Sequence, residues 1–174
     1  MRDLKAAIRD VPDFPKPGIV FKDITPVLLD AELFGRAIEA MAAPYAGAGI
    51  SRVVSIESRG FLLGAPIALR LGAGLVPIRK PGKLPAATQR VEYALEYGTD
   101  ALEMHHDAIG ASDRVLIVDD VLATGGTAAA AAQLVGGAGG KGSVAGFSFL
   151  IELDFLKGRQ RLQGWRVEAL LHYT

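Results

Sequence analysis

One segment constrains the fold of this chain more than any other, because it joins a buried strand to a helix through a short loop. Residues 115–118 form an uninterrupted run of Val, Leu, Ile and Val, which is typical of a strand covered on both faces of a parallel sheet. Residues 127–135 contain five consecutive alanines and strongly favour helix. Such a strand–loop–helix segment is half of the unit from which parallel sheets are built.

The same alternation continues on both sides of this segment. Strands are predicted at 53–56, 75–78, 144–151 and 167–171, and helices at 60–71 and from an Asp30 N-cap through Phe34, Ile38 and Met41. A short amphipathic helix at 4–8 and an irregular, proline-rich stretch at 13–18 precede them. We therefore predict an α/β fold, in which a single domain over residues 1–174 has a parallel sheet flanked by helices.

Composition and charge exclude several classes of protein. The 174 residues carry 19 Lys and Arg against 19 Asp and Glu, and this zero net charge argues against a dedicated nucleic-acid binder. The chain has no cysteine, which excludes a disulfide scaffold and a Cys-ligated zinc site. It shows neither the apolar core of a signal peptide nor a run of about 20 apolar residues, so we expect a cytoplasmic protein that does not enter a membrane.

Residues 80–106 interrupt the alternation of strands and helices. The stretch 80–85 is irregular, whereas apolar and polar residues alternate from Val91 to Tyr97 and end at a turn signal, 98–100. This pattern predicts a β-hairpin inserted between two strands of the core. An insertion of this length is typical of a lid over an active site, and a static arm that contacts a second subunit is an equally good interpretation.

Two aspartates and a glycine loop follow the apolar run. Asp119 and Asp120 come at its carboxyl end, where open α/β sheets bind their ligands. Gly125 and Gly126 let successive backbone N–H groups converge at the N-terminus of the predicted helix, which suits a phosphate group. The carboxylates would repel a phosphate but can accept hydrogen bonds from hydroxyls. The segment therefore predicts a ribose 5-phosphate site, and a plain turn is less favoured because two buried charges are costly.

Cations follow the ends of two other predicted strands. Arg59 comes shortly after strand 53–56, and Arg79, Lys80 and Lys83 come after strand 75–78. In a parallel sheet these loops lie on the same edge as the two aspartates. The sequence therefore predicts that the four side chains hold a polyanion such as pyrophosphate.

Two other patterns are interpreted as structural. Residues 137–142 match G-x-G-x-x-G, but they follow a predicted helix and precede a strand, which is the reverse of a dinucleotide-binding turn. We interpret them as a helix end and a turn. His105 and His106 are adjacent and lack an evident third ligand, so we predict surface histidines rather than a metal site.

Five segments, in order along the chain, resemble the adenine-specific branch of the type I phosphoribosyltransferases. They are Phe14–Asp23, Glu57–Phe61, Ile78–Pro85, Leu95–Gly98 and Val115–Thr127. Many members of the family share the last segment, whereas the other four together are highly specific. The resemblance covers nearly the whole chain.

The resemblance implies transfer of a 5-phosphoribosyl group from phosphoribosyl pyrophosphate (PRPP) to adenine, which yields AMP and pyrophosphate. Magnesium (Mg²⁺) is expected to arrive with PRPP, with no direct protein ligand, and the active form is expected to be a homodimer. Residues 1–30 would form a hood over the base, and residues 80–106 would form the lid. Neither nucleic acid nor a membrane is an expected partner.

The resemblance also assigns roles to residues. It assigns the 5-phosphate to Ala123, Thr124, Gly125, Gly126 and Thr127, and the ribose hydroxyls to Asp119 and Asp120. It assigns pyrophosphate to Arg59, Arg79, Lys80 and Lys83, and adenine to the backbone around Val20, Phe21 and Lys22. Glu96 on the lid and Arg59 are the expected catalytic residues, and a cis peptide is expected at Glu57–Ser58.

Two alternatives accompany this interpretation. The first is transfer to another purine base, such as hypoxanthine or guanine; here Lys22 stands where the family usually has Arg. The second is a regulator that senses PRPP or a nucleotide without catalysis. The presence of Glu96 and of all four cations favours an enzyme.

Overall fold

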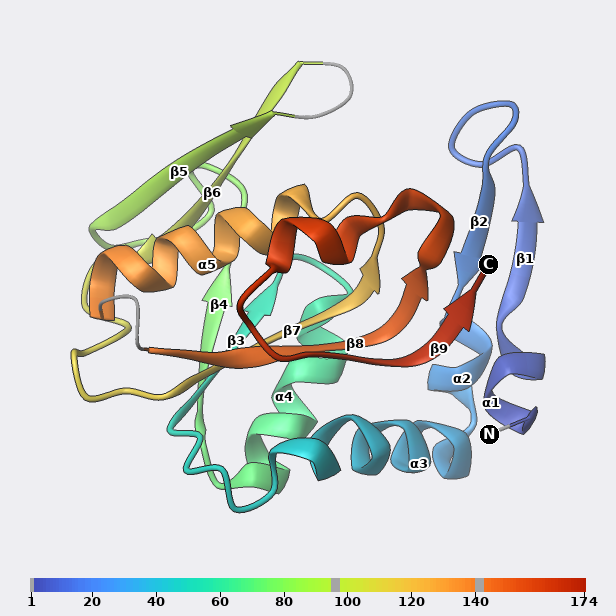
Figure 1. Ribbon diagram of the computed structural model, residues 1–174, viewed down its shortest axis with the longest axis horizontal. Helices are drawn as coiled ribbons and strands as arrows, with labels where there is room; N and C mark the ends of the chain where they lie inside the picture. The colour runs from blue at the N-terminus through green and yellow to red at the C-terminus, as the bar shows by residue number, and fades with distance from the viewer. Residues whose placement is uncertain (1, 95–97, 140–142) are drawn as a thin grey trace. The chain divides into compact units, whose positions relative to one another are not determined.

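The structure, a computed structural model, describes residues 2–94, 98–139 and 143–174 (Figure 1). The chain divides into two compact units, residues 1–40 and residues 41–174. The larger unit contains the sheet and the glycine loop, and the smaller unit contains the segment that resembles the hood.

The larger unit is built on a five-stranded sheet in the order β4-β3-β7-β8-β9. Every neighbouring pair in it is parallel, which confirms the predicted α/β class. The strands are β3 (Arg52–Ile56), β4 (Gly74–Ile78), β7 (Val115–Leu122), β8 (Val144–Leu153) and β9 (Val167–Tyr173). All carboxyl ends therefore point to one edge of the sheet, where a ligand site is expected.

Two helices cover opposite faces of this sheet, α4 (Gly60–Leu71) and α5 (Gly126–Gly139) (Figure 1). Alternate residues of β3 divide between the faces. Val54 belongs to the apolar core that α5 helps to form, whereas Ser55 faces α4. A Cβ on Gly64 of α4 would lie 2.6 Å from the Cβ of Ser55, so only glycine allows this close approach.

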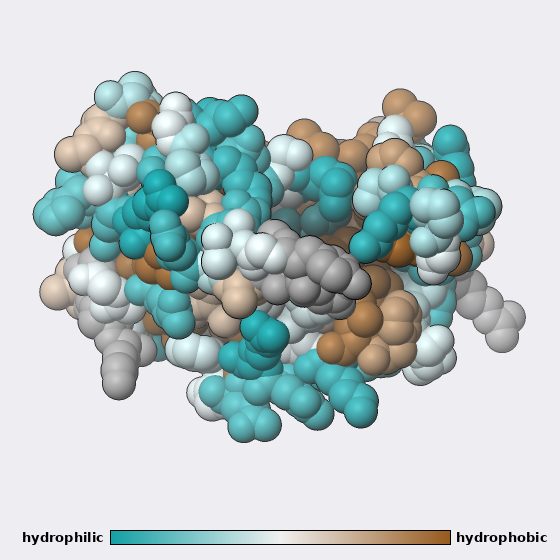
Figure 2. Space-filling model, turned by 90° about the horizontal axis from the view of Figure 1, so that it is seen from above, coloured by the Kyte–Doolittle hydropathy of each residue, from teal (hydrophilic) through white to brown (hydrophobic). Residues whose placement is uncertain are grey.

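The predicted hairpin is present between β4 and β7. Strand β5 (Thr88–Ala94) pairs antiparallel with β6 (Thr99–His105), and β5 lies against α5 (Figure 1). The backbone of Arg79 also pairs with Glu103 of β6, which ties the base of the hairpin to the end of β4. Seen from above, hydrophilic side chains predominate over the hairpin (Figure 2), in keeping with a solvated outer face.

Two element boundaries differ from the prediction. Strand β7 continues to Leu122, because its pairing with β8 extends to the pair Leu122 and Glu152. Asp119 and Asp120 therefore lie within the strand rather than after it. Helix α5 continues to Gly139, past the first glycines of the 137–142 segment. Glycine weakens a helix without ending it when packing supports the preceding turns.

Short 3₁₀ helices complete the larger unit. They are η1 (Ala43–Tyr45), η2 (Asp154–Leu156) and η3 (Gly158–Leu162). The last two occupy the connection between β8 and β9, which sequence analysis left without an element. Tyr45 of η1 is buried, and its hydroxyl donates a 2.7 Å hydrogen bond to the carbonyl oxygen of Phe147.

The smaller unit contains α1 (Arg2–Ala7), an antiparallel pair of β1 (Arg9–Pro12) and β2 (Val20–Asp23), and α2 (Thr25–Leu29). Helix α3 (Ala31–Ala42) follows, and Asp30 caps it as predicted: its Oδ1 accepts the N–H groups of Glu32 and Leu33, both at 3.0 Å. Sequence analysis did not predict the β1–β2 pair, because the prolines at 12, 15 and 17 hide any period of two.

Candidate active site

A pocket opens where β7 ends and α5 begins. It has about 330 Å³ of empty volume and is lined by Asp119, residues 121–128 and Phe149. We call residues 123–127 the glycine loop. Gly125 has a φ of +79°, a conformation that places consecutive backbone groups on one side of the loop. The loop leads directly into α5 at Gly126, so the pocket faces the positive end of a helix dipole.

The two aspartates of β7 have different surroundings, because neighbouring residues of a strand point to opposite faces. Asp119 lines the pocket, and its Oδ1 accepts the N–H of Asp120 at 2.9 Å. Burial of this carboxyl group and the charge of Asp120 raise the pKa of Asp119 well above its usual range. Asp120 is 4% exposed and forms an ion pair with Arg59.

Arg59 comes from the connection between β3 and α4, which also contains the expected cis peptide, Glu57–Ser58. The Glu57 carboxylate accepts the Lys80 N–H at 3.0 Å and the Arg79 Nε–H at 3.2 Å. Desolvation alone would raise the pKa of Glu57, but these hydrogen bonds and the positive charges of Arg79 and Lys83 together outweigh it and lower the pKa. The β3 and β4 connections are thus held together at the carboxyl edge of the sheet.

The other predicted cations lie on this same edge. Arg79 donates from Nη1 to the carbonyl oxygen of Lys83 at 3.1 Å, and Lys83 itself is exposed. Lys80 forms an ion pair with Asp100 of β6. Desolvation would lower the pKa of Lys80, but hydrogen bonds to Asp100 and Tyr93 together with their charges outweigh it and raise the pKa. The same Lys80 hydrogen bond lowers the pKa of Asp100.

Tyr93 of the hairpin connects these cations to the glycine loop, a role that sequence analysis missed. Its hydroxyl donates to Asp100 at 3.2 Å and lies 3.4 Å from Oγ1 of Thr127. In the sequence, Tyr93 was only one apolar position in an alternating strand. Nothing local indicated that its hydroxyl would reach α5.

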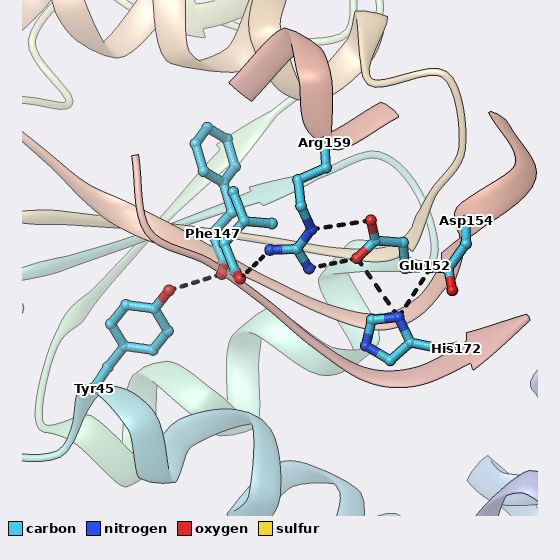
Figure 3. A network of polar contacts seen from close by, with 7 residues as sticks. Tyr45, Phe147, Glu152, Asp154, Arg159 and His172 are labelled. Atoms are coloured by element: carbon cyan, nitrogen blue, oxygen red, sulfur yellow. Dashed lines mark hydrogen bonds and ion pairs between the residues drawn. The ribbon is translucent and has the colours of Figure 1, made fainter. Parts of the chain in front are cut away.

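The η3 segment also reaches the glycine loop, and sequence analysis missed it as well. A Cβ on Gly158 would collide with the carbonyl oxygen of Ala123, and a Cβ on Gly125 would collide with that of Gly158. The two backbones are therefore in direct contact. Arg159 anchors the segment through Glu152 of β8, with Nε 3.1 Å from Oε1 and Nη2 2.5 Å from Oε2 (Figure 3).

The Glu152 side chain is also part of a group of potential metal ligands. Ligand atoms of Glu152, Asp154 and His172 lie within 4.8 Å of one another. However, Arg159 donates to both oxygens of Glu152, which leaves that carboxylate poorly suited to a cation (Figure 3). Of the two histidines noted in the sequence, His106 is exposed and His105 is partly buried.

The remaining predicted site residues lie elsewhere in the chain. Glu96 is outside the described residues. Val20, Phe21 and Lys22 form most of β2 in the smaller unit. There, Lys22 Nζ lies 2.6 Å from Oδ1 of Asp10, and the ring of Phe21 packs edge to face on that of Phe14 with centroids 5.1 Å apart. In the part of the chain that the structure describes, no helix has the length and apolar character needed to span a bilayer.

A glycine loop at a helix N-terminus, beside an aspartate at the carboxyl edge of a parallel sheet, defines an α/β protein that binds a sugar phosphate or nucleotide. Its relatives identify the class further. The chain belongs to the phosphoribosyl transferase domain family, whose model matches residues 28–159.

Similar proteins and structures cover nearly all of the chain. It is 63% identical to the adenine phosphoribosyltransferase of Myxococcus xanthus, over 98% of this chain and 92% of that protein. It is 57% identical to that of Solibacter usitatus over 99% of each. The crystal structure of adenine phosphoribosyltransferase from Thermoanaerobacter pseudethanolicus superposes with a TM-score of 0.95, at 53% identity over 99% of each chain.

A more distant structure contains bound ligands. The adenine phosphoribosyltransferase of Trypanosoma brucei, in complex with AMP, pyrophosphate and ribose-5-phosphate, has a TM-score of 0.88 and 26% identity. The match covers 98% of this chain and 78% of that one.

Proposed function

We propose that this protein transfers the 5-phosphoribosyl group of PRPP to adenine and releases AMP and pyrophosphate. The observation that carries the proposal is the pocket at the glycine loop, which combines a phosphate cradle with a carboxylate suited to ribose hydroxyls. Close relatives that are adenine phosphoribosyltransferases support the choice of reaction and base.

The first part of the mechanism is binding of the ribose 5-phosphate. Backbone N–H groups of residues 123–127 donate to the phosphate, and the dipole of α5 stabilises its charge. Asp119 and Asp120 are assigned to the ribose hydroxyls. Asp120 is already paired with Arg59. The same carboxylate that is assigned to the ribose therefore also positions the Arg59 side chain.

The second part is departure of pyrophosphate. Arg59, Arg79, Lys80 and Lys83 are the groups that stabilise its negative charge. PRPP enters as its complex with Mg²⁺, which neutralises part of that charge. The bond between C1 of the ribose and the pyrophosphate oxygen breaks, and its electron pair leaves with pyrophosphate. The ribose then carries positive charge, which requires that water be excluded from the site.

The third part is attack by adenine. N9 of adenine forms the new bond to C1, and the proton that N9 carried must be accepted. We assign this proton to Glu96, the carboxylate at the position that the resemblance gives to the catalytic glutamate, because a carboxylate can serve as a general base. The backbone around Val20, Phe21 and Lys22 is assigned to the amino edge of adenine, which a 6-oxo purine cannot match in hydrogen-bond polarity.

We also propose a cytoplasmic homodimer in which each chain is one phosphoribosyltransferase domain, with a hood at 1–30 and a lid at 80–106. Three exposed leucines on the larger unit support dimer formation. Leu62 and Leu69, seven residues apart on α4, are 49% and 84% exposed, and Leu75 on the edge strand β4 is 44% exposed.

The test is direct product analysis with competing bases. The protein is incubated with PRPP and Mg²⁺ together with adenine, hypoxanthine or guanine, and the nucleotide is identified by chromatography. We expect AMP, with kcat/KM for adenine orders of magnitude above that for hypoxanthine, since a buried polarity mismatch has that effect. Comparable values for the two bases would overturn the assignment of adenine. No nucleotide from any base would overturn the enzymatic function itself.

A further inference from the structure

Arg161 of η3 lies beside the first residue of α5. Its Nη1 is 3.7 Å from the position that a Cβ on Gly126 would occupy. The ring of Tyr93 lies 3.6 Å from the same position, on the hairpin side. The absence of a side chain at Gly126 thus leaves the N-terminus of α5 bordered by a guanidinium and a phenol ring.

The charge of Arg161 is not balanced by an acid. The side chain is exposed, and within residues 2–94, 98–139 and 143–174 it forms no ion pair. Arg159, two residues earlier, has both oxygens of Glu152 as partners. A cation beside a helix N-terminus is electrostatically unfavourable by itself, because that end of the helix is already positive. The placement becomes favourable when an anion occupies the space between them.

The segment that bears Arg161 is held firmly at this place. Gly158 contacts the glycine loop through its backbone, and Leu162 is 1% exposed in the core. Between them, Arg159 is fixed to Glu152 and donates from Nη1 to the carbonyl oxygen of Val167 at 2.7 Å (Figure 3). Arg161 therefore projects from an anchored turn, so the backbone that bears it needs little further ordering when a ligand binds.

We propose that Arg161 is a further binding residue for the 5-phosphate, and that its guanidinium donates hydrogen bonds to the phosphate oxygens from the side opposite the backbone N–H groups. The inference rests on the proposed function, because it assumes that a ribose 5-phosphate occupies the glycine loop. The ligand it recognises is a dianionic phosphate monoester, common to PRPP and AMP. The guanidinium adds a positively charged donor with two parallel N–H groups, which the neutral backbone N–H groups do not provide.

The test compares Arg161→Gln with Arg161→Lys and with Lys157→Gln. Lys157 is exposed in the same connection but, unlike Arg161, is not among the three nearest neighbours of a Cβ on Gly126, so Lys157→Gln removes one positive charge without a predicted ligand contact. For Arg161→Gln we expect KM for PRPP and Kd for AMP, measured by calorimetry, each to rise roughly tenfold, as loss of one charge-assisted hydrogen bond predicts. KM for adenine and the melting temperature should stay at wild-type values. Arg161→Lys should recover much of the affinity, and Lys157→Gln should resemble wild type.

The outcomes separate this inference from the proposed function. If wild-type protein forms AMP but Arg161→Gln keeps wild-type KM for PRPP and Kd for AMP, Arg161 does not bind the phosphate and the function stands. If Lys157→Gln weakens binding as much as Arg161→Gln, the effect is long-range charge and the inference is again wrong. A wild-type protein that neither forms AMP nor binds it overturns the proposed function first.

Discussion

The backbone of Gly158 packs directly against the backbone of Gly125. Gly125 lies in the connection between β7 and α5, whereas Gly158 lies in the connection between β8 and β9. A side chain at either position would overlap a carbonyl oxygen of the other segment. The shape of the glycine loop is therefore maintained from outside by the connection between β8 and β9. That connection is in turn fixed by Arg159 and Glu152 (Figure 3).

Gly158→Ala should lower stability and weaken use of PRPP together. Overpacking of this kind costs about 1–3 kcal/mol, and the displaced backbone belongs to the glycine loop. Thermal unfolding and KM for PRPP provide the two readouts. Gly136→Ala is the matched control, because Gly136 lies within α5 with no atom within 4 Å of an added Cβ, so it should keep activity and equal or exceed wild-type stability. Wild-type values for both measurements in Gly158→Ala would show that the loop does not need this contact.

Asp119→Asn and Asp120→Asn should each raise KM for PRPP while the protein still folds. Each change removes charge-assisted hydrogen bonds, which contribute roughly 1.5–3 kcal/mol apiece. Asp120→Asn also weakens the partner of Arg59, so it should affect pyrophosphate inhibition in addition. Steady-state kinetics and circular dichroism check both variants. Wild-type kinetics for PRPP in both would refute the assignment of these residues to the ribose.

Glu96→Gln should lower kcat by about 10²–10⁴-fold, the usual contribution of a general acid–base group, with PRPP affinity near wild type. Glu92→Gln is the control, because Glu92 is an exposed hairpin residue whose carboxylate lies 2.8 Å from Nη2 of Arg90. It should change kcat little. If Glu96→Gln retains more than about a third of wild-type kcat, far above the range for such a group, the proton has another acceptor.

Hydrogen exchange over residues 80–106 should slow when PRPP and Mg²⁺ bind. Lys80 is paired with Asp100 in the structure, and pyrophosphate offers it a second anionic partner, so ligand binding should reorganise and order this segment. Peptide-level exchange by mass spectrometry, with and without PRPP, measures the change. Peptides of α4 provide an internal reference. Equal protection in the two states would instead favour the static arm suggested by the same sequence pattern.

Tyr45→Phe should change the pH dependence of stability. Burial raises the pKa of Tyr45 to about 12, whereas an unfolded chain has a tyrosine pKa of about 10. Between these values the native state keeps a proton that the unfolded chain loses. The free energy of unfolding of the wild type therefore falls as pH rises, by about 1.4 kcal/mol per pH unit from this group.

The Phe variant lacks this dependence but also lacks the hydrogen bond to Phe147, so it should be less stable by about 1 kcal/mol at pH 8. The difference should shrink above pH 10 and vanish near pH 11. Urea unfolding at several pH values measures it, and the other tyrosines cancel in the comparison. If the free energy of unfolding has the same pH dependence in wild type and Tyr45→Phe, the pKa of Tyr45 is not raised by folding.

Several elements could be predicted because their signals are local. Helix α4 was predicted with both of its ends, since the apolar run stops at Gly72, which has a φ of +66°. Asp30 could be recognised as a cap because its side chain needs only the N–H groups two and three residues later. The β1–β2 pair escaped notice because prolines hide strand periodicity.

The order of residues in the chain was enough to determine the α/β class, the glycine loop at the start of α5, and the aspartates and cations at the carboxyl edge of the sheet. All of these depend on periodicity, turn chemistry and the direction of neighbouring parallel strands, which are properties of short segments. Only the tertiary structure decided which residues from distant parts of the chain contact the glycine loop and the start of α5. Tyr93 reaches Thr127 across 34 residues of chain, and η3 brings Gly158 to Gly125 and Arg161 to Gly126. Those contacts arise when distant segments bury their apolar faces on one sheet, and no pattern within a single segment records which surfaces will then adjoin.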